Sequence, residues 1–77
     1  MPRGLNNWSA EDVVRFLKSH NFAFGRAKGS HYFYIGKVEG VMRQVCVPFH
    51  GAKTLKPRTV KGIILQSGII KNEWLGG

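Results

Sequence analysis

The sequence predicts an α+β domain with the element order α-β-β-β-α, in which two helices cover one face of a three-stranded antiparallel sheet. Three observations lead to this prediction. A capped amphipathic segment lies near the N-terminus, two aromatic and β-branched runs separated by a turn follow, and a second amphipathic segment comes after a loop. A chain of 77 residues forms one domain, residues 1–77, with a thin core.

We expect the first helix at about residues 10–19. Ser9 can cap its N-terminus, and Asp12 stands at the third helical position, as in a capping box. Asn21 can end the helix in a left-handed conformation, after which residues 22–24 read as a short strand. The buried face of the helix is supplied by Val13, Val14, Phe16 and Leu17.

A β-hairpin is expected in the middle of the chain. Residues 31–36 and 41–47 are aromatic and β-branched, and residues 37–40 between them have turn chemistry. Pro48 should end the second of these strands because proline cannot donate a hydrogen bond to a neighbouring strand.

The second helix is expected after a loop that runs from His50 to Arg58. Thr59 can cap this helix, and Gly68 can end it. Residues 72–75 can add a final turn that places Trp74 against the core. One apolar face is formed by Val60, Ile63 and Ile64. The resulting order of elements is the layout of double-stranded-RNA-binding domains (dsRBDs).

The composition favours a polyanionic partner. Twelve Lys and Arg against four Asp and Glu give a net charge of +8, so nucleic acid is the leading partner class, ahead of an acidic protein and of an anionic membrane. A single cysteine, Cys46, permits no internal disulfide, and no spacing of cysteine and histidine suits zinc. With no leader sequence or membrane-spanning stretch recognisable, we expect a cytoplasmic protein.

Three segments, GRAKGSH, VCVPFH and LKPRTVKGIILQSGI, together resemble the HicA family of toxins from toxin–antitoxin systems. The resemblance covers nearly the whole chain. It implies a dsRBD-like fold, an mRNA interferase activity that inhibits translation and growth, and a HicB-like antitoxin protein as partner. It also implies that the histidine of Gly29-Ser30-His31 is the catalytic residue.

The distribution of acidic residues agrees with a nuclease that uses no metal. The acids are Glu11 and Asp12 in the first helix, Glu39 in a turn and Glu73 near the end, so we expect no carboxylate cluster for metal ions and no cofactor. RNA carries its own nucleophile, the 2′-OH. Its cleavage needs a base, an acid and positive charge, and histidine, with an ordinary pKa of about 6.5, can serve as either base or acid.

Cationic residues surround this histidine in the sequence. Arg26, Lys28 and Lys53 can supply charge to the reacting phosphate. Four other cations, Arg43, Lys56, Arg58 and Lys61, are expected to cluster near the start of the second helix, where backbone N–H groups favour phosphate. The candidate RNA-binding residues are Arg26, Lys28, Ser30, Arg43, His50, Lys53, Lys56, Arg58 and Lys61.

The position of His50 depends on the register of the hairpin. If Glu39 and Gly40 form the turn centre, His31 faces Pro48, and His50 then lies at the same end with the same side-chain parity as His31. A slip of one residue would send the two histidines to opposite faces. His50 is therefore a candidate second proton-transfer or phosphate-binding group.

Three other side chains have two readings each. Tyr32 and Tyr34 can stack on bases, although aromatic residues in a sheet more often pack against their neighbours. Cys46 can be a nucleophile, but a buried small apolar residue is the expected role.

The functional prediction is a metal-independent endoribonuclease toxin that cleaves single-stranded or loosely structured mRNA. The alternative from another class is a non-catalytic dsRBD-like module that only holds RNA. A basic DNA-associated or ribosome-associated structural protein is a third reading, and only the net charge supports it.

Overall fold

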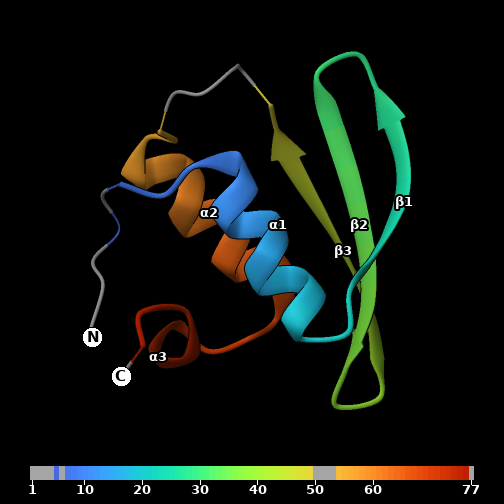
Figure 1. Ribbon diagram of the computed structural model, residues 1–77. Helices are drawn as coiled ribbons and strands as arrows, with labels where there is room; N and C mark the ends of the chain where they lie inside the picture. Colours follow the sequence, from blue (N-terminus) through green and yellow to red (C-terminus); the bar gives the residue numbers. More distant parts are fainter. Residues whose placement is uncertain (1–4, 6, 50–53, 77) are drawn as a thin grey trace.

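A computed structural model describes residues 5, 7–49 and 54–76 of the chain. The strands form one antiparallel sheet in the order β1-β2-β3, and Figure 1 shows α1 and α2 on the same side of it. This arrangement confirms the predicted dsRBD-like α+β fold. The elements are α1 (Ala10–Ser19), β1 (Ala23–Lys28), β2 (His31–Val38), β3 (Val41–Pro48), α2 (Pro57–Ser67) and α3 (Lys71–Trp74).

The first helix has the predicted bounds and the predicted cap. The backbone N–H of Asp12 donates to Ser9 Oγ, and the backbone N–H of Ser9 donates to Asp12 Oδ2, each over 3.1 Å. Asn21 adopts a φ of 68° just after the helix, as expected of a residue that ends it. Val13 and Leu17 are fully buried, so this helix anchors the core.

Two tight turns fix the register of the sheet. Gly29-Ser30 joins β1 to β2 and Glu39-Gly40 joins β2 to β3, with positive φ at Gly29, Glu39 and Gly40, as two-residue hairpin turns require. The second turn places His31 opposite Pro48, which confirms the predicted register. Because the first turn is so short, β1 extends to Lys28 and is longer than the predicted strand at 22–24.

A β-bulge interrupts β1. Phe24 pairs with Tyr34, but Arg26 pairs with Phe33, so Gly25 is an extra residue in the strand. A Cβ at Gly25 would lie only 3.2 Å from the carbonyl oxygen of Phe33. Glycine therefore suits this close approach of two backbones.

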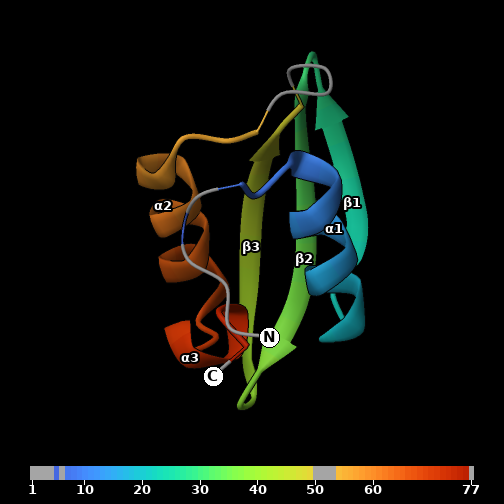
Figure 2. The same cartoon turned by 60° about the vertical axis from the view of Figure 1, so that its left-hand side comes forward.

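The core lies between the sheet and the two long helices. Burial alternates along β2 and β3, where Tyr34 and Gly36 are buried together with Val45 and Val47. Gly36 makes room for a neighbouring ring, because a Cβ there would lie 2.6 Å from Phe22 Cγ. Side chains alternate along a strand, so these buried residues lie on the face of the sheet that α1 and α2 cover (Figure 2), and the residues between them in sequence lie on the other face.

The second long helix starts earlier than predicted. It begins at Pro57 with Lys56 as N-cap, and the Lys56 side chain makes no capping hydrogen bond, so the predicted cap at Thr59 is wrong. Proline suits the first helical position because its φ is fixed near the helical value and its missing N–H has no helical acceptor. The helix ends as predicted at Gly68, which has a φ of 72°.

The C-terminal turn closes the core as predicted. Trp74 is 2% exposed, and its ring stacks on Phe16 at a centroid distance of 3.8 Å. Trp74 Nε1 donates to the buried hydroxyl of Ser67 over 3.3 Å, and that hydroxyl donates to the Ile64 carbonyl over 2.7 Å. The C-terminal segment is thereby joined to the end of α2.

Candidate nucleic-acid interface

His31 is the first residue of β2, the central strand of the sheet. It follows the Gly29-Ser30 turn directly, and its side chain is exposed to solvent. Its cross-strand partners are Lys28 on β1 and Pro48 on β3. Side chains alternate along a strand, so His31 lies on the face of the sheet that is turned away from the helices.

The bulge at Gly25 determines which face the cations of β1 occupy. Phe24 is on the helix side, where its ring lies 5.8 Å from that of Tyr34. In a regular strand, Arg26 would share that side because it is two residues further on. The extra residue reverses the alternation, and Arg26 and Lys28 instead lie on the face of His31.

Arg26 lies over an aromatic ring on this face. Its guanidinium carbon is 4.8 Å from the ring centroid of Phe33, within the range of a cation–π interaction. Phe33 is two residues after His31 on the same strand, so both side chains lie on the same face. Phe33 is not among the candidate residues predicted from the sequence, although its shared parity with His31 is a signal for this position.

The tyrosines of β2 lie on the opposite face and do not accompany His31. Tyr34 is 5% exposed, and burial together with the nearby Tyr32 raises the pKa of its hydroxyl above 10.0. Tyr32 is half-buried, with its ring 4.5 Å from that of Phe49. The reading of Tyr32 and Tyr34 as packing residues is therefore the correct one.

Cys46 lies on the face of His31, opposite Phe33, and it is half-exposed where a buried position was expected. Its backbone N–H donates to Gln66 Oε1 over 3.0 Å, so α2 covers part of the free edge of β3. The N–H groups of alternate residues point to that edge, and Pro48 occupies such a position two residues later. The missing N–H of Pro48 therefore removes no hydrogen bond between β3 and β2.

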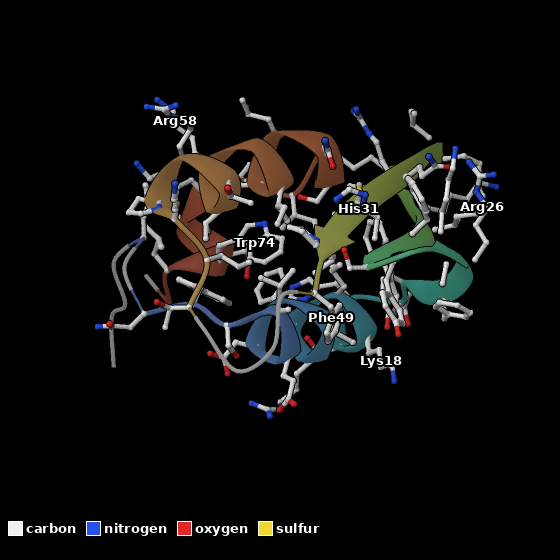
Figure 3. The ribbon with its side chains drawn as sticks, turned by 90° about the horizontal axis from the view of Figure 1, so that it is seen from above. Lys18, Arg26, His31, Phe49, Arg58 and Trp74 are labelled. Atoms are coloured by element: carbon white, nitrogen blue, oxygen red, sulfur yellow. The ribbon has the colours of Figure 1, made fainter. Side chains whose placement is uncertain are left out.

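Three of the predicted RNA-binding cations lie at the start of α2. Lys56, Arg58 and Lys61 are exposed, and Figure 1 shows that α2 begins near the same end of the sheet at which β2 begins. Figure 3, viewed from that end, shows His31 between Arg58 and Arg26, whereas Lys18 is on the far side with α1. The backbone N–H groups of the first turn of α2 add positive potential there.

Arg43 does not belong to this cluster, and its predicted position near the start of α2 is wrong. It lies on the helix side of β3, opposite Gly36, and is half-buried. Its guanidinium contacts Gly68 at the other end of α2. Gly36 is five residues from His31 along β2, which separates the two positions by about 16 Å.

Of the remaining candidate residues, the structure describes Ser30, which lies in the turn at this end. Ser30 is exposed in the first turn, and its carbonyl accepts a 2.7 Å hydrogen bond from the N–H of Phe49. His50 and Lys53 lie outside the described residues, so their predicted roles remain predictions.

Acidic residues do not gather within the part of the chain that the structure describes. There, no group of three or more His, Cys, Asp or Glu side chains is placed to hold a metal ion. Asp12 forms the cap of α1 and an ion pair with Arg15, with an N–O distance of 3.3 Å. Across the same residues, none of the helices has the length and apolar character needed to cross a membrane.

Comparison with known families identifies one match. The model of a family described as the HicA toxin of bacterial toxin–antitoxin matches residues 10–69, from the first residue of α1 to just beyond α2. The matched region therefore includes β2 with His31 and the basic start of α2. No match was found among curated proteins.

Proposed function

The chain belongs to the HicA toxin family, and from this premise we propose that it is an endoribonuclease that cleaves mRNA and uses His31 for proton transfer. As a member of this family it is the toxin of a toxin–antitoxin system. The finer proposal names the substrate, the chemistry and the residue.

The observation that carries the proposal is the setting of His31. The side chain is exposed, it stands at the end of the central strand, and it shares its face with Arg26 and Lys28. A backbone phosphate held between these cations would have its neighbouring 2′-OH and 5′-oxygen within reach of an imidazole. Cations at this position stabilise the negative charge that develops on the phosphorane.

The proposed reaction is a transesterification within the RNA. The 2′-oxygen attacks the adjacent phosphorus and gives its proton to a base, and the bond from phosphorus to the 5′-oxygen breaks as that oxygen takes a proton from an acid. The products are a 2′,3′-cyclic phosphate and a 5′-hydroxyl. His31 performs one of these two proton transfers, since an imidazole side chain can act as a base or as an acid.

The second proton transfer requires another group or water. His50 remains the candidate side chain because it follows Pro48, the cross-strand partner of His31, by two residues in the sequence. We assign Arg26, Lys28, Lys56, Arg58 and Lys61 to binding of the RNA backbone.

The partner follows from the family and from the charge. A toxin of a toxin–antitoxin system is paired with an antitoxin, and we propose a HicB-like protein that presents an acidic face. With a net charge of +8, the surface that binds RNA also attracts such a partner. Occlusion of His31 by the antitoxin is then the simplest form of inhibition.

The chemistry is tested with a defined RNA in the presence of EDTA. Cleavage should continue in the chelator and stop at a site whose 5′ nucleotide carries a 2′-deoxyribose, and the fragments should end in a cyclic or 3′-phosphate. Fragments with 3′-hydroxyl ends, or a strict requirement for magnesium, would contradict the mechanism. Binding of RNA without any cleavage would favour the non-catalytic RNA-binding module.

A further inference from the structure

An aromatic ring with a guanidinium above it lies next to His31 on the exposed face of the sheet. Phe33 is half-buried, and Arg26 covers its ring at 4.8 Å. The buried core lies on the helix side of the sheet. The ring of Phe33 lies on the opposite face and is therefore not needed to pack this core. The arrangement depends on the bulge at Gly25, which brings Arg26 to this face.

We propose that Phe33 and Arg26 form a stacking subsite for one RNA base, next to the nucleotide whose phosphate lies at His31. The inference rests on the proposed ribonuclease function, and it adds a binding site for a base to a site that otherwise holds only the backbone. Aromatic rings and guanidinium planes are the two protein surfaces on which unpaired RNA bases stack.

The spacing along β2 supports the assignment. His31 and Phe33 are two residues apart on one strand, so their side chains are separated by about 6.6 Å. A base on Phe33 therefore belongs to a nucleotide adjacent to the reacting phosphate. Such a contact would hold the backbone in position at His31, and it requires a base that is free of a duplex.

The guanidinium group of Arg26 has two faces that can take part in this subsite. One face of its guanidinium is against Phe33, and its side chain is otherwise exposed. The outer face of the guanidinium can accept a base, or the side chain can move to a phosphate while the base takes its place on the ring. Lys28 and His31, which form the next cross-strand pair on this face, border the same area.

An acidic antitoxin can pair with the cations of this face, but RNA supplies both the anion and the aromatic base at a regular spacing, so the ring beside the cations favours RNA. The alternative is that Arg26 and Phe33 form a surface cation–π pair that only contributes to stability. In that case, removal of the ring changes the free energy of unfolding but leaves RNA affinity unchanged.

The test uses an RNA that cannot be cleaved, so that binding is measured apart from catalysis. The probe is a 2′-O-methyl oligonucleotide of about ten nucleotides with one 2-aminopurine, a length within the usual site size. The variants are Phe33→Leu, Phe33→Trp and Phe24→Leu, the last a matched control because Phe24 is 51% exposed on the other side of the sheet. Circular dichroism verifies that each variant is folded.

Phe33→Leu should weaken binding about 5- to 100-fold and abolish the quenching of 2-aminopurine. Phe33→Trp should retain both, and Phe24→Leu should bind like the parent. Equal affinities for the parent and Phe33→Leu, or equal losses for Phe33→Leu and Phe24→Leu, would overturn the subsite. These results are independent of cleavage, so failure of the subsite leaves the proposed reaction standing, and failure of the reaction leaves the subsite standing.

Discussion

The guanidinium of Arg43 occupies the space beside Gly68, where a Cβ would lie 2.6 Å from Arg43 Nε. The Nε atom is buried and has no hydrogen-bond partner among the described residues. Arg43 thus lies beneath the C-terminal end of α2, where the helix dipole favours a cation. We expect its charge to stabilise this end of the helix, and it is distant from the cations at the start of α2.

The positions of Arg43 and Arg58 predict that removal of the first charge affects stability and removal of the second affects RNA binding. Arg58→Gln should lower RNA affinity and reduce the salt slope by about 0.7, because one phosphate contact is lost on a single strand. Arg43→Gln should leave the slope unchanged and lower the midpoint of urea unfolding. Fluorescence anisotropy at several salt concentrations measures the slope. A reduced slope for Arg43→Gln would contradict the structure.

A matched control for the same experiment is Lys18→Gln. Lys18 is exposed in the last turn of α1, away from His31 in Figure 3. Its removal changes the net charge by the same amount as Arg58→Gln. If both variants lower the slope equally, the binding is a non-specific effect of net charge.

Two glycine substitutions should have opposite effects on stability. Gly36→Ala should destabilise the protein by about 1–3 kcal/mol, because its Cβ would meet the buried ring of Phe22 at 2.6 Å. Gly62→Ala, within α2, meets nothing within 4 Å and should stabilise by about 0.5–1 kcal/mol. Urea unfolding compares them, and a neutral Gly36→Ala would show that Phe22 is not fixed against the strand.

The binding of RNA and the binding of the antitoxin should depend on the same cations. Lys28→Glu, directly opposite His31, should weaken both complexes, and the association rate of the antitoxin should fall at high salt. Stopped-flow kinetics with the purified partner measures this rate. An antitoxin that binds Lys28→Glu like the parent, and inhibits without blocking RNA binding, would exclude occlusion.

Local signals in the sequence are sufficient for most of the fold. Ser9 and Asp12 set the start of α1, and Glu39-Gly40 set the register that pairs His31 with Pro48. Each of these depends on residues a few positions apart. The start of α2 differs from the prediction because Pro57 is a stronger signal for the first helical position than Thr59 is for a cap.

The set of residues that form the candidate site was harder to predict, because it depends on which face of the sheet each side chain occupies. Alternation from Phe24 assigns Arg26 to the helix side, and only the bulge at Gly25 moves it to the face of His31. The contact of Arg26 with Phe33 depends on the same bulge, whereas Phe33 itself shares the strand parity of His31, which is visible in the sequence. Arg43 was misplaced because its position beneath Gly68 results from packing between β3 and α2.

The central claim is that His31 transfers a proton in RNA cleavage, and its most direct test is the cleavage rate of His31→Ala. The substrate is a defined mRNA in EDTA, and His20→Ala serves as the control, since His20 lies at the C-terminal end of α1 and stacks on Phe16. His31→Ala should be folded by circular dichroism, bind the RNA, and cleave at least about 100-fold more slowly than the parent, while His20→Ala keeps its activity. A folded His31→Ala that cleaves at the rate of the parent would contradict the account.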